Sequence, residues 1–303
     1  MASRKYYSTR RGAGGAPQPI TLPQLRRLVY AVYTQFREKG FFHESMGYDC
    51  VDRRRPTGTM GESPESYAYL KLRRYGLWPP DSAKDYSETD LFDQIEFMHD
   101  HVSKPMDWDY HGYSECGFHS SRWDSNSGRQ EFREQMNQVL ADYGKGYELS
   151  DLGEVLERGD EGMDVLLKAD LPSVVPISVV ARVTSAVLAF RRRDANEEDR
   201  RNVVRTLASV LEHLRPLLKQ ALTKQDEADL FELANRFGIR HLRADQKTAY
   251  DPVVWLPWMF YYYLAAIHAS TRLIEKAGLT IPILPGSHSA SPPSSEHVSS
   301  SAS

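Results

Sequence analysis

Apolar residues recur at helical spacing in the first half of the chain, although unevenly. The clearest helix begins after Thr21 and stops before Gly40. Its apolar face consists of Leu25, Leu28, Val29, Val32, Tyr33 and Phe36. The same pattern, less regular, predicts further helices over residues 64–75, 88–99 and 129–143.

The segment between His101 and Gly128 is polar and shows no periodicity, so it is predicted to be a long loop. A short hairpin is expected around residues 151–153, where turn residues separate two apolar runs. Residues 21–170 are therefore expected to form an irregular, mostly helical N-terminal domain. The sequence does not indicate the role of this domain.

The second half of the chain is more regular and predicts a mainly α fold. Helices are expected over residues 174–193, from Asn196 onward, over 225–237, and from Asp251 to Ala277. Asp251 followed by Pro252 is a typical helix start, and Gly278 is a typical stop. Four helices with short connections predict an antiparallel four-helix bundle over residues 171–280.

Both ends of the chain differ from these two regions. Residues 1–20 are basic and rich in Gly and Pro, and residues 281–303 are rich in Ser and Pro; both are expected to be disordered. No secretory signal is visible at the start. The apolar run over residues 253–267 is shorter than the ~20 residues that a membrane-spanning helix needs. We therefore expect no membrane partner.

The overall composition is that of an ordinary soluble protein. The 303 residues are 41% hydrophobic and 26% charged, with a net charge of −3. This balance argues against a surface covered by nucleic acid, although a local basic patch remains compatible with it. The two cysteines, Cys50 and Cys116, are too few for a disulfide framework, which favours the cytoplasm.

Candidate chemistry lies at the end of the third helix of the bundle. Arg236 falls on the last predicted turn, Gly238 is expected to end the helix, and His241 follows just beyond it. On an uninterrupted helix the Arg236 and His241 side chains would point in different directions. A helix end at Gly238 allows both to turn into one pocket, with Glu232 one turn earlier on the same face as Arg236.

An Arg-x4-His element at this place in a four-helix bundle resembles the HEPN superfamily. The chain is also similar to J-type abortive-infection proteins, which join an irregular N-terminal domain to an HEPN-like bundle. The similar segments are FREQMNQVLADYGKGYELSDLGEV in the first region and VRTLASVLEHL in the second helix of the bundle. The resemblance implies a metal-independent endoribonuclease of an antiphage or toxin type, without a cofactor, that pairs as a homodimer through its bundle.

The residue types suit that chemistry. A histidine titrates near neutral pH, so His241 is the candidate general base for the 2′-hydroxyl of RNA. The guanidinium of Arg236 stays charged and fits the phosphorane that develops. Arg240 and Arg243 are candidate contacts to the RNA backbone. Glu232 is a candidate for orienting the catalytic pair.

Two other functions stay open. Phe237 follows Arg236 where active relatives usually have Asn, His or Asp, which favours a non-catalytic helical binding or regulatory module. The second alternative is a zinc-stabilised interaction protein. Its candidate ligands lie close together in the sequence and include a Cys-x2-His spacing: His99, His101, His111, Cys116 and His119. The surrounding Asp, Ser, Tyr and Trp residues need no metal, and we expect no stoichiometric zinc.

Overall fold

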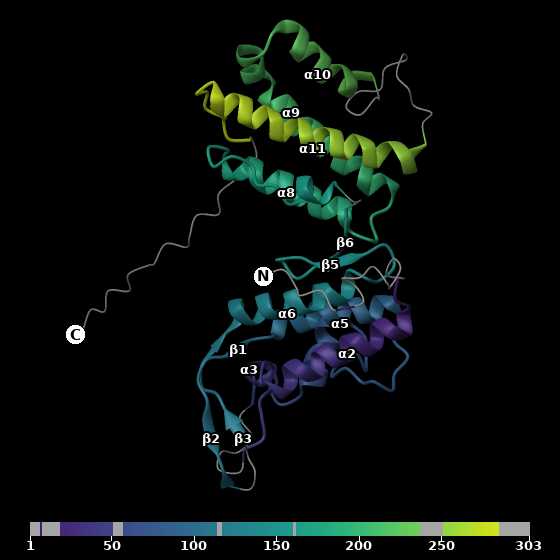
Figure 1. Ribbon diagram of the computed structural model, residues 1–303, viewed down its shortest axis with the longest axis vertical. Coiled ribbons are helices and arrows are strands. Elements are labelled where there is room, and N and C mark those ends of the chain that lie inside the picture. Colours follow the sequence, from purple (N-terminus) through teal and green to yellow (C-terminus); the bar gives the residue numbers. More distant parts are fainter. Residues whose placement is uncertain are drawn as a thin grey trace, which may run out of the picture. The chain divides into compact units, whose positions relative to one another are not determined.

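The computed structural model describes residues 19–50, 57–113, 117–159, 162–236 and 251–284, together with Tyr7. In this part of the chain the fold is mainly helical, with short pairs of antiparallel strands (Figure 1). Contacts between residues divide the chain into two compact units, Met1–Arg158 and Gly159–Ser303. Each unit encloses its own apolar core.

Two helices of the first unit, α2 and α5, begin where the sequence predicts. α2 (Leu22–Glu38) begins after Thr21, whose backbone N–H donates to the side chain of Gln24 at 2.7 Å. α5 (Glu88–His101) begins after Ser87, whose hydroxyl caps the first turn. The other helices described in this unit are α3 (His43–Met46), α4 (Pro64–Leu72) and α6 (Ser125–Leu140). α2, α5 and α6 pack against one another around the core.

Residues 101–128 were predicted to be a polar loop, but strands form there. β1 (Lys104–Pro105) pairs with β4 (Trp123–Asp124), and between them β2 (Asp109–His111) pairs with β3 (Gly117–His119). Both pairs are antiparallel. The loop prediction is wrong because strands of two or three residues are too short to show the alternation of apolar and polar positions that identifies a strand.

The hairpin predicted around residues 151–153 is confirmed. β5 (Tyr147–Leu149) pairs antiparallel with β6 (Val155–Glu157). Gly153 lies in the turn with a φ of 86°, a left-handed conformation that favours glycine. The backbone N–H of Leu149 donates to the Asn137 side chain at 2.6 Å, which holds the hairpin against α6.

α6 begins earlier than the predicted start at Arg129 because Asp124 caps it. The carboxylate of Asp124 accepts the backbone N–H groups of Asn126 and Ser127. Gly128 then allows the helix to lie close to β1, since an added Cβ would be 2.6 Å from the backbone nitrogen of Lys104. This close approach fixes the base of the β2–β3 hairpin against the core of the unit.

The second unit is built around α9. Its described helices are α7 (Asp164–Leu167), α8 (Ile177–Arg191), α9 (Glu197–Ala221), α10 (Lys224–Arg236) and α11 (Pro252–Lys276). α8, α10 and α11 each pack against α9 (Figure 1). Asn196 and Asp251 cap α9 and α11 as the sequence predicts, because each side chain accepts a backbone N–H of the first turn.

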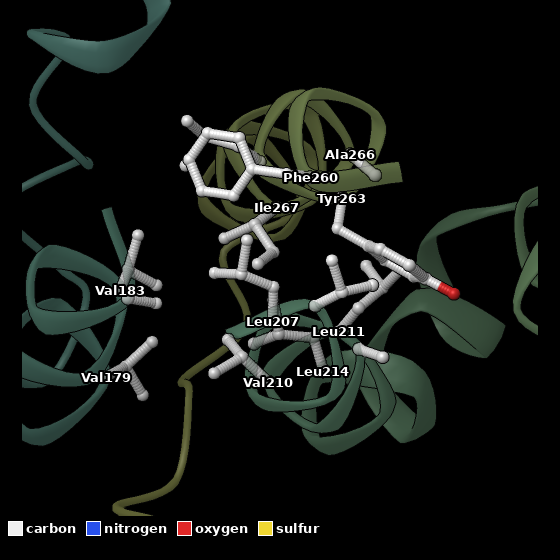
Figure 2. Close-up of a cluster of buried hydrophobic side chains, with 14 of the residues drawn as sticks. Val179, Val183, Leu207, Val210, Leu211, Leu214, Phe260, Tyr263, Ala266 and Ile267 are labelled. Carbon is white, nitrogen blue, oxygen red and sulfur yellow. The ribbon is translucent and has the colours of Figure 1, made fainter. Parts of the chain in front are cut away.

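Apolar side chains from three helices converge in the core of this unit (Figure 2). α8 contributes Val179 and Val183, α9 contributes Leu207, Val210, Leu211 and Leu214, and α11 contributes Phe260, Tyr263, Ala266 and Ile267. The ring of Phe260 also stacks on Phe190 of α8, with 3.8 Å between the ring centroids. One face of α8 and one face of α9 thus supply buried apolar residues to this core.

The boundary predicted at residue 281 requires a correction. Ile281 and Leu284 are buried in the core of the second unit, so the disordered tail does not begin at residue 281. The carbonyl of Pro282 lies 2.9 Å from Nε2 of His213, which adds a polar contact. The sequence predicts a Ser/Pro-rich tail from residue 281 because Ile281 and Leu284 are separate apolar residues that show no periodicity.

α11 carries the apolar run that raised the question of a membrane. Among the described residues, no helix is both long enough and apolar enough to cross a lipid bilayer. Tyr263 and His268 of α11 are instead buried among protein side chains.

Candidate functional site

The predicted nuclease residues lie at and beyond the end of α10. Glu232 and Arg236 belong to this helix, and Arg236 is the last residue described before a gap. The positions of their side chains are not described. Residues 237–250, which include Gly238, Arg240, His241 and Arg243, lie outside the described residues. The proximity of Arg236 to His241 therefore stays a prediction.

The helix that carries Arg236 is firmly held by its neighbours. Phe231 is buried, and the guanidinium of Arg215 on α9 lies 4.4 Å from the centre of its ring. Arg215 also pairs with Glu227 on α10. The hydroxyl of Tyr262 on α11 donates to the carbonyl of Leu230 at 2.9 Å. These contacts fix the axis of α10 relative to α9 and α11.

A cleft lies beside α8 and the first turns of α9. Its volume is about 660 Å³, and its lining includes Arg182, Arg192 and Asp199 along with small side chains. The connection between α8 and α9, residues 192–196, supplies Arg192 to this lining. The cleft places charged side chains of both signs around a hollow that the sequence pattern did not indicate.

A second group of side chains with metal-binding chemistry lies in the first unit. Cys50, His111 and His119 each offer one ligand atom, and these atoms all lie within 4.8 Å of one another. His111 and His119 belong to the predicted group of zinc ligands, whereas Cys50 does not. Cys116, the remaining cysteine, lies outside the described residues.

Two histidines of the predicted group lie elsewhere. His99 is buried on α5, where an added Cβ at Gly153 would be 2.5 Å from its Nδ1. The ring of His101 packs against Phe97, with 4.4 Å between ring centroids. His99 therefore does not join the other candidate ligands, because its side chain lies beside the turn of the β5–β6 hairpin and not beside the β2–β3 hairpin.

The hairpin register explains how two of the ligands meet. His119 pairs directly with Asp109, and His111 lies two residues after Asp109 on the same strand. Since side chains alternate between the two faces of a strand, all three share one face of the hairpin. The rings of His111 and His119 are 4.7 Å apart and nearly perpendicular.

Cys50 reaches this face from the segment that follows α3. Its Sγ lies 3.7 Å from Nδ1 of His111. The other ring nitrogen of His111, Nε2, lies 3.2 Å from a carboxylate oxygen of Asp109. The hydrogen bond with the Cys50 thiol, together with the one to Asp109, raises the pKa of His111.

Aromatic residues surround His119, which is itself buried. Its ring stacks on Tyr48, with 4.4 Å between centroids, and Tyr48 in turn contacts the ring of His43 at 5.2 Å. Burial lowers the pKa of His43, and the nearby His119 lowers it further. Burial therefore favours the neutral form of the His43 imidazole.

Asp107 anchors the base of the β2–β3 hairpin. Its carboxylate accepts hydrogen bonds from the Ser120 hydroxyl at 2.6 Å, from both donor groups of Ser121, and from the Arg122 backbone N–H. These hydrogen bonds, that of Ser120 first, hold the pKa of Asp107 far below its usual range. The hairpin that carries His111 and His119 is thus fixed at its base by an ionised carboxylate.

The signal for Cys50 in the sequence is weak. It lies 61 residues before His111, and no short motif joins the two. Comparison with protein-family models, curated proteins and solved structures finds no significant match to this chain. Support for the candidate sites therefore comes from their own residues and geometry.

Proposed function

We propose that the protein is a metal-independent endoribonuclease of an abortive-infection or toxin type. In this proposal α8, α9, α10 and α11 form an HEPN-like antiparallel four-helix bundle. One observation carries it: α10 is held against α9 and α11 by Phe231 and Tyr262, and it presents Arg236 at its end. The connection that contains His241 leads from this helix end to α11.

The proposed reaction is an internal transesterification. His241 takes the proton of the 2′-hydroxyl as the 2′ oxygen bonds to phosphorus. Arg236 stabilises the charge of the phosphorane. The bond between phosphorus and the 5′ oxygen then breaks, and that oxygen takes up a proton. The products are a 2′,3′-cyclic phosphate and a 5′-hydroxyl end.

Neighbouring residues complete the proposed site. Arg240 and Arg243 bind the RNA backbone, and Glu232 orients the catalytic pair. A second copy of the chain supplies the acid that protonates the leaving oxygen, which requires a homodimer. α11 offers apolar surface for such pairing, since Val253, Val254 and Trp258 are exposed at its beginning.

The N-terminal unit would sense a trigger, restrain the nuclease or recruit its target. We place the protein in the cytoplasm of a prokaryotic cell, where its RNA substrate is found. If the bundle lacks catalytic activity, the alternative is a binding or regulatory module in which Arg236 stabilises the end of its own helix.

The test is cleavage of single-stranded RNA by the full-length protein. Arg236→Ala and His241→Ala should each abolish cleavage while the far-UV circular dichroism spectrum stays unchanged. Arg205→Ala and His213→Ala, which alter an exposed and a half-buried residue of α9, serve as matched controls and should retain activity. Cleavage that survives both Arg236→Ala and His241→Ala would remove the pair from the mechanism.

A further inference from the structure

We propose that Cys50, His111 and His119 bind a zinc ion that fixes the β2–β3 hairpin to the segment after α3. One thiol and two imidazoles are among the ligands that zinc prefers. They come from three separate places, namely the segment after α3, the end of β2 and the end of β3. Their convergence results from the fold and not from neighbourhood in the sequence.

The distances suit a tetrahedral ion. Bonds of about 2.3 Å to sulfur and about 2.0–2.1 Å to nitrogen place the two ligand atoms about 3.6 Å apart. The observed distance from Sγ of Cys50 to Nδ1 of His111 is 3.7 Å. The third ligand atom, on His119, lies within 4.8 Å of the other two, so small side-chain rotations complete the geometry.

A carboxylate orients one of the ligands. Histidine ligands usually use their second nitrogen to contact a carboxylate or carbonyl, which fixes the ring and its tautomer. Nε2 of His111 lies 3.2 Å from Asp109 while Nδ1 faces Cys50. The stack on Tyr48 restrains the ring of His119 in a similar way. Asp109 and Tyr48 thus hold the two histidine ligands in place.

The β2–β3 hairpin has few interactions of its own to stabilise it. Isolated two-stranded hairpins are marginally stable in water. β2 and β3 have three residues each, and the side chains of Tyr110 and Tyr113 are exposed, so burial contributes little on their side. A zinc bond from the hairpin to Cys50 supplies the missing stabilisation.

The alternative is a metal-free pair in which His111 activates the Cys50 thiol. The zinc site and the metal-free pair predict opposite reactivity of the Cys50 thiol. A zinc-bound thiolate is protected from alkylation until a chelator removes the metal, whereas an activated thiolate reacts at once. Alkylation at Cys50 can be followed separately from Cys116 by peptide mass spectrometry of the wild-type protein, so this measurement needs no variant.

Zinc content tests the site directly in full-length protein whose affinity tag has been removed. We expect about one zinc ion per chain in the wild type and in the control His101→Gln, whose ring packs against Phe97 on α5. Cys50→Ser and His111→Asn should lose most of this zinc. Cys50→His, which replaces one zinc ligand by another, should retain it. Asp109→Asn should bind zinc about 10- to 100-fold more weakly.

Several results would overturn the proposal. They are a wild-type protein that neither contains zinc nor takes it up on titration, zinc content unaffected by Cys50→Ser and His111→Asn, and rapid alkylation of Cys50 before chelation. If Cys50→Ser and His111→Asn do not fold, the alkylation of the wild-type protein and the zinc content of Cys50→His still decide.

Discussion

The thiol of Cys50 lies 3.7 Å from Nδ1 of His111, although 61 residues separate the two along the chain. A carboxylate on the same hairpin face, that of Asp109, contacts the other nitrogen of the His111 ring. This geometry is the one by which proteins orient a metal-binding histidine. It links the segment after α3 to the β2–β3 hairpin, in a region where the sequence predicts a loop.

Chelation should therefore loosen the hairpin while the second unit stays intact. Removing zinc takes away the bond between Cys50 and the histidines, so amide hydrogen exchange should speed up in residues 109–111 and 117–119. Exchange in α9 and α11 should not change. Hydrogen-exchange mass spectrometry with and without chelator measures both regions. Equal exchange in the hairpin under the two conditions would argue against a structural metal.

Leu211 should be critical for the stability of the second unit. Its side chain is fully buried in the core formed by α8, α9 and α11 (Figure 2). Leu211→Ala removes apolar contacts and leaves a cavity, so the free energy of unfolding should fall by about 2–5 kcal/mol. Val165→Ala, at an exposed position of α7, should change it by no more than about 0.5 kcal/mol. Urea unfolding followed by a probe in this unit compares the two.

His268 should make the second unit sensitive to acid. Burial lowers its pKa, the charge of Arg272 lowers it further, and Asp170 opposes them. The ordinary pKa is 6.5, so the unfolded chain takes up the proton first as the pH falls. The stabilisation is therefore present above pH 6.5 and lost as the pH falls through the lower folded value.

The variant His268→Gln removes this titration. Its stability should fall less than that of the wild type between about pH 7 and about pH 5, measured by urea unfolding at both values. His213→Gln, at a half-buried position of α9, is the control and should behave as the wild type. An identical acid response in His268→Gln would show that other groups cause it.

Self-association should depend on the exposed beginning of α11. Trp258 is 42% exposed and stacks on Tyr262, so it offers a large apolar surface to a second copy. Trp258→Asp should raise the dissociation constant of the dimer at least about tenfold, which corresponds to about 1.4 kcal/mol. Ile177→Asp, also at an exposed apolar position, should leave it unchanged. Sedimentation equilibrium of the full chain decides, and a monomeric wild type at micromolar concentration would exclude the homodimer.

Local signals account for the parts of the fold that the sequence predicted well. Thr21, Ser87, Asn196 and Asp251 mark helix starts because a short polar side chain before an apolar pattern satisfies the free N–H groups of the first turn. These interactions span only a few residues, so they can be predicted from the sequence without knowledge of the tertiary fold. The mainly helical character of the chain follows from them.

The metal-binding cluster was only partly predictable, because its assembly is a tertiary property. His111 and His119 are close in the sequence and meet through the hairpin register. Cys50 joins them only through the packing of a distant segment. His99 was included for its nearness in sequence, yet it follows Ile95 by one helical turn and is buried with it. The helical period, and not sequence proximity, determined its position.

The most direct test of the proposed function is the requirement for the 2′-hydroxyl of RNA. The full-length protein is incubated with an RNA whose cleavage position has been mapped and with a copy that carries a single 2′-deoxyribose there. The reaction is run in excess EDTA and also in metal-free buffer without chelator, so that loss of a bound zinc is not mistaken for loss of a catalytic metal. Our account predicts cleavage of the first RNA under both conditions, with a 2′,3′-cyclic phosphate end, and none at the modified position. Cleavage at the deoxyribose, a requirement for added Mg²⁺, or no cleavage of either RNA would contradict it.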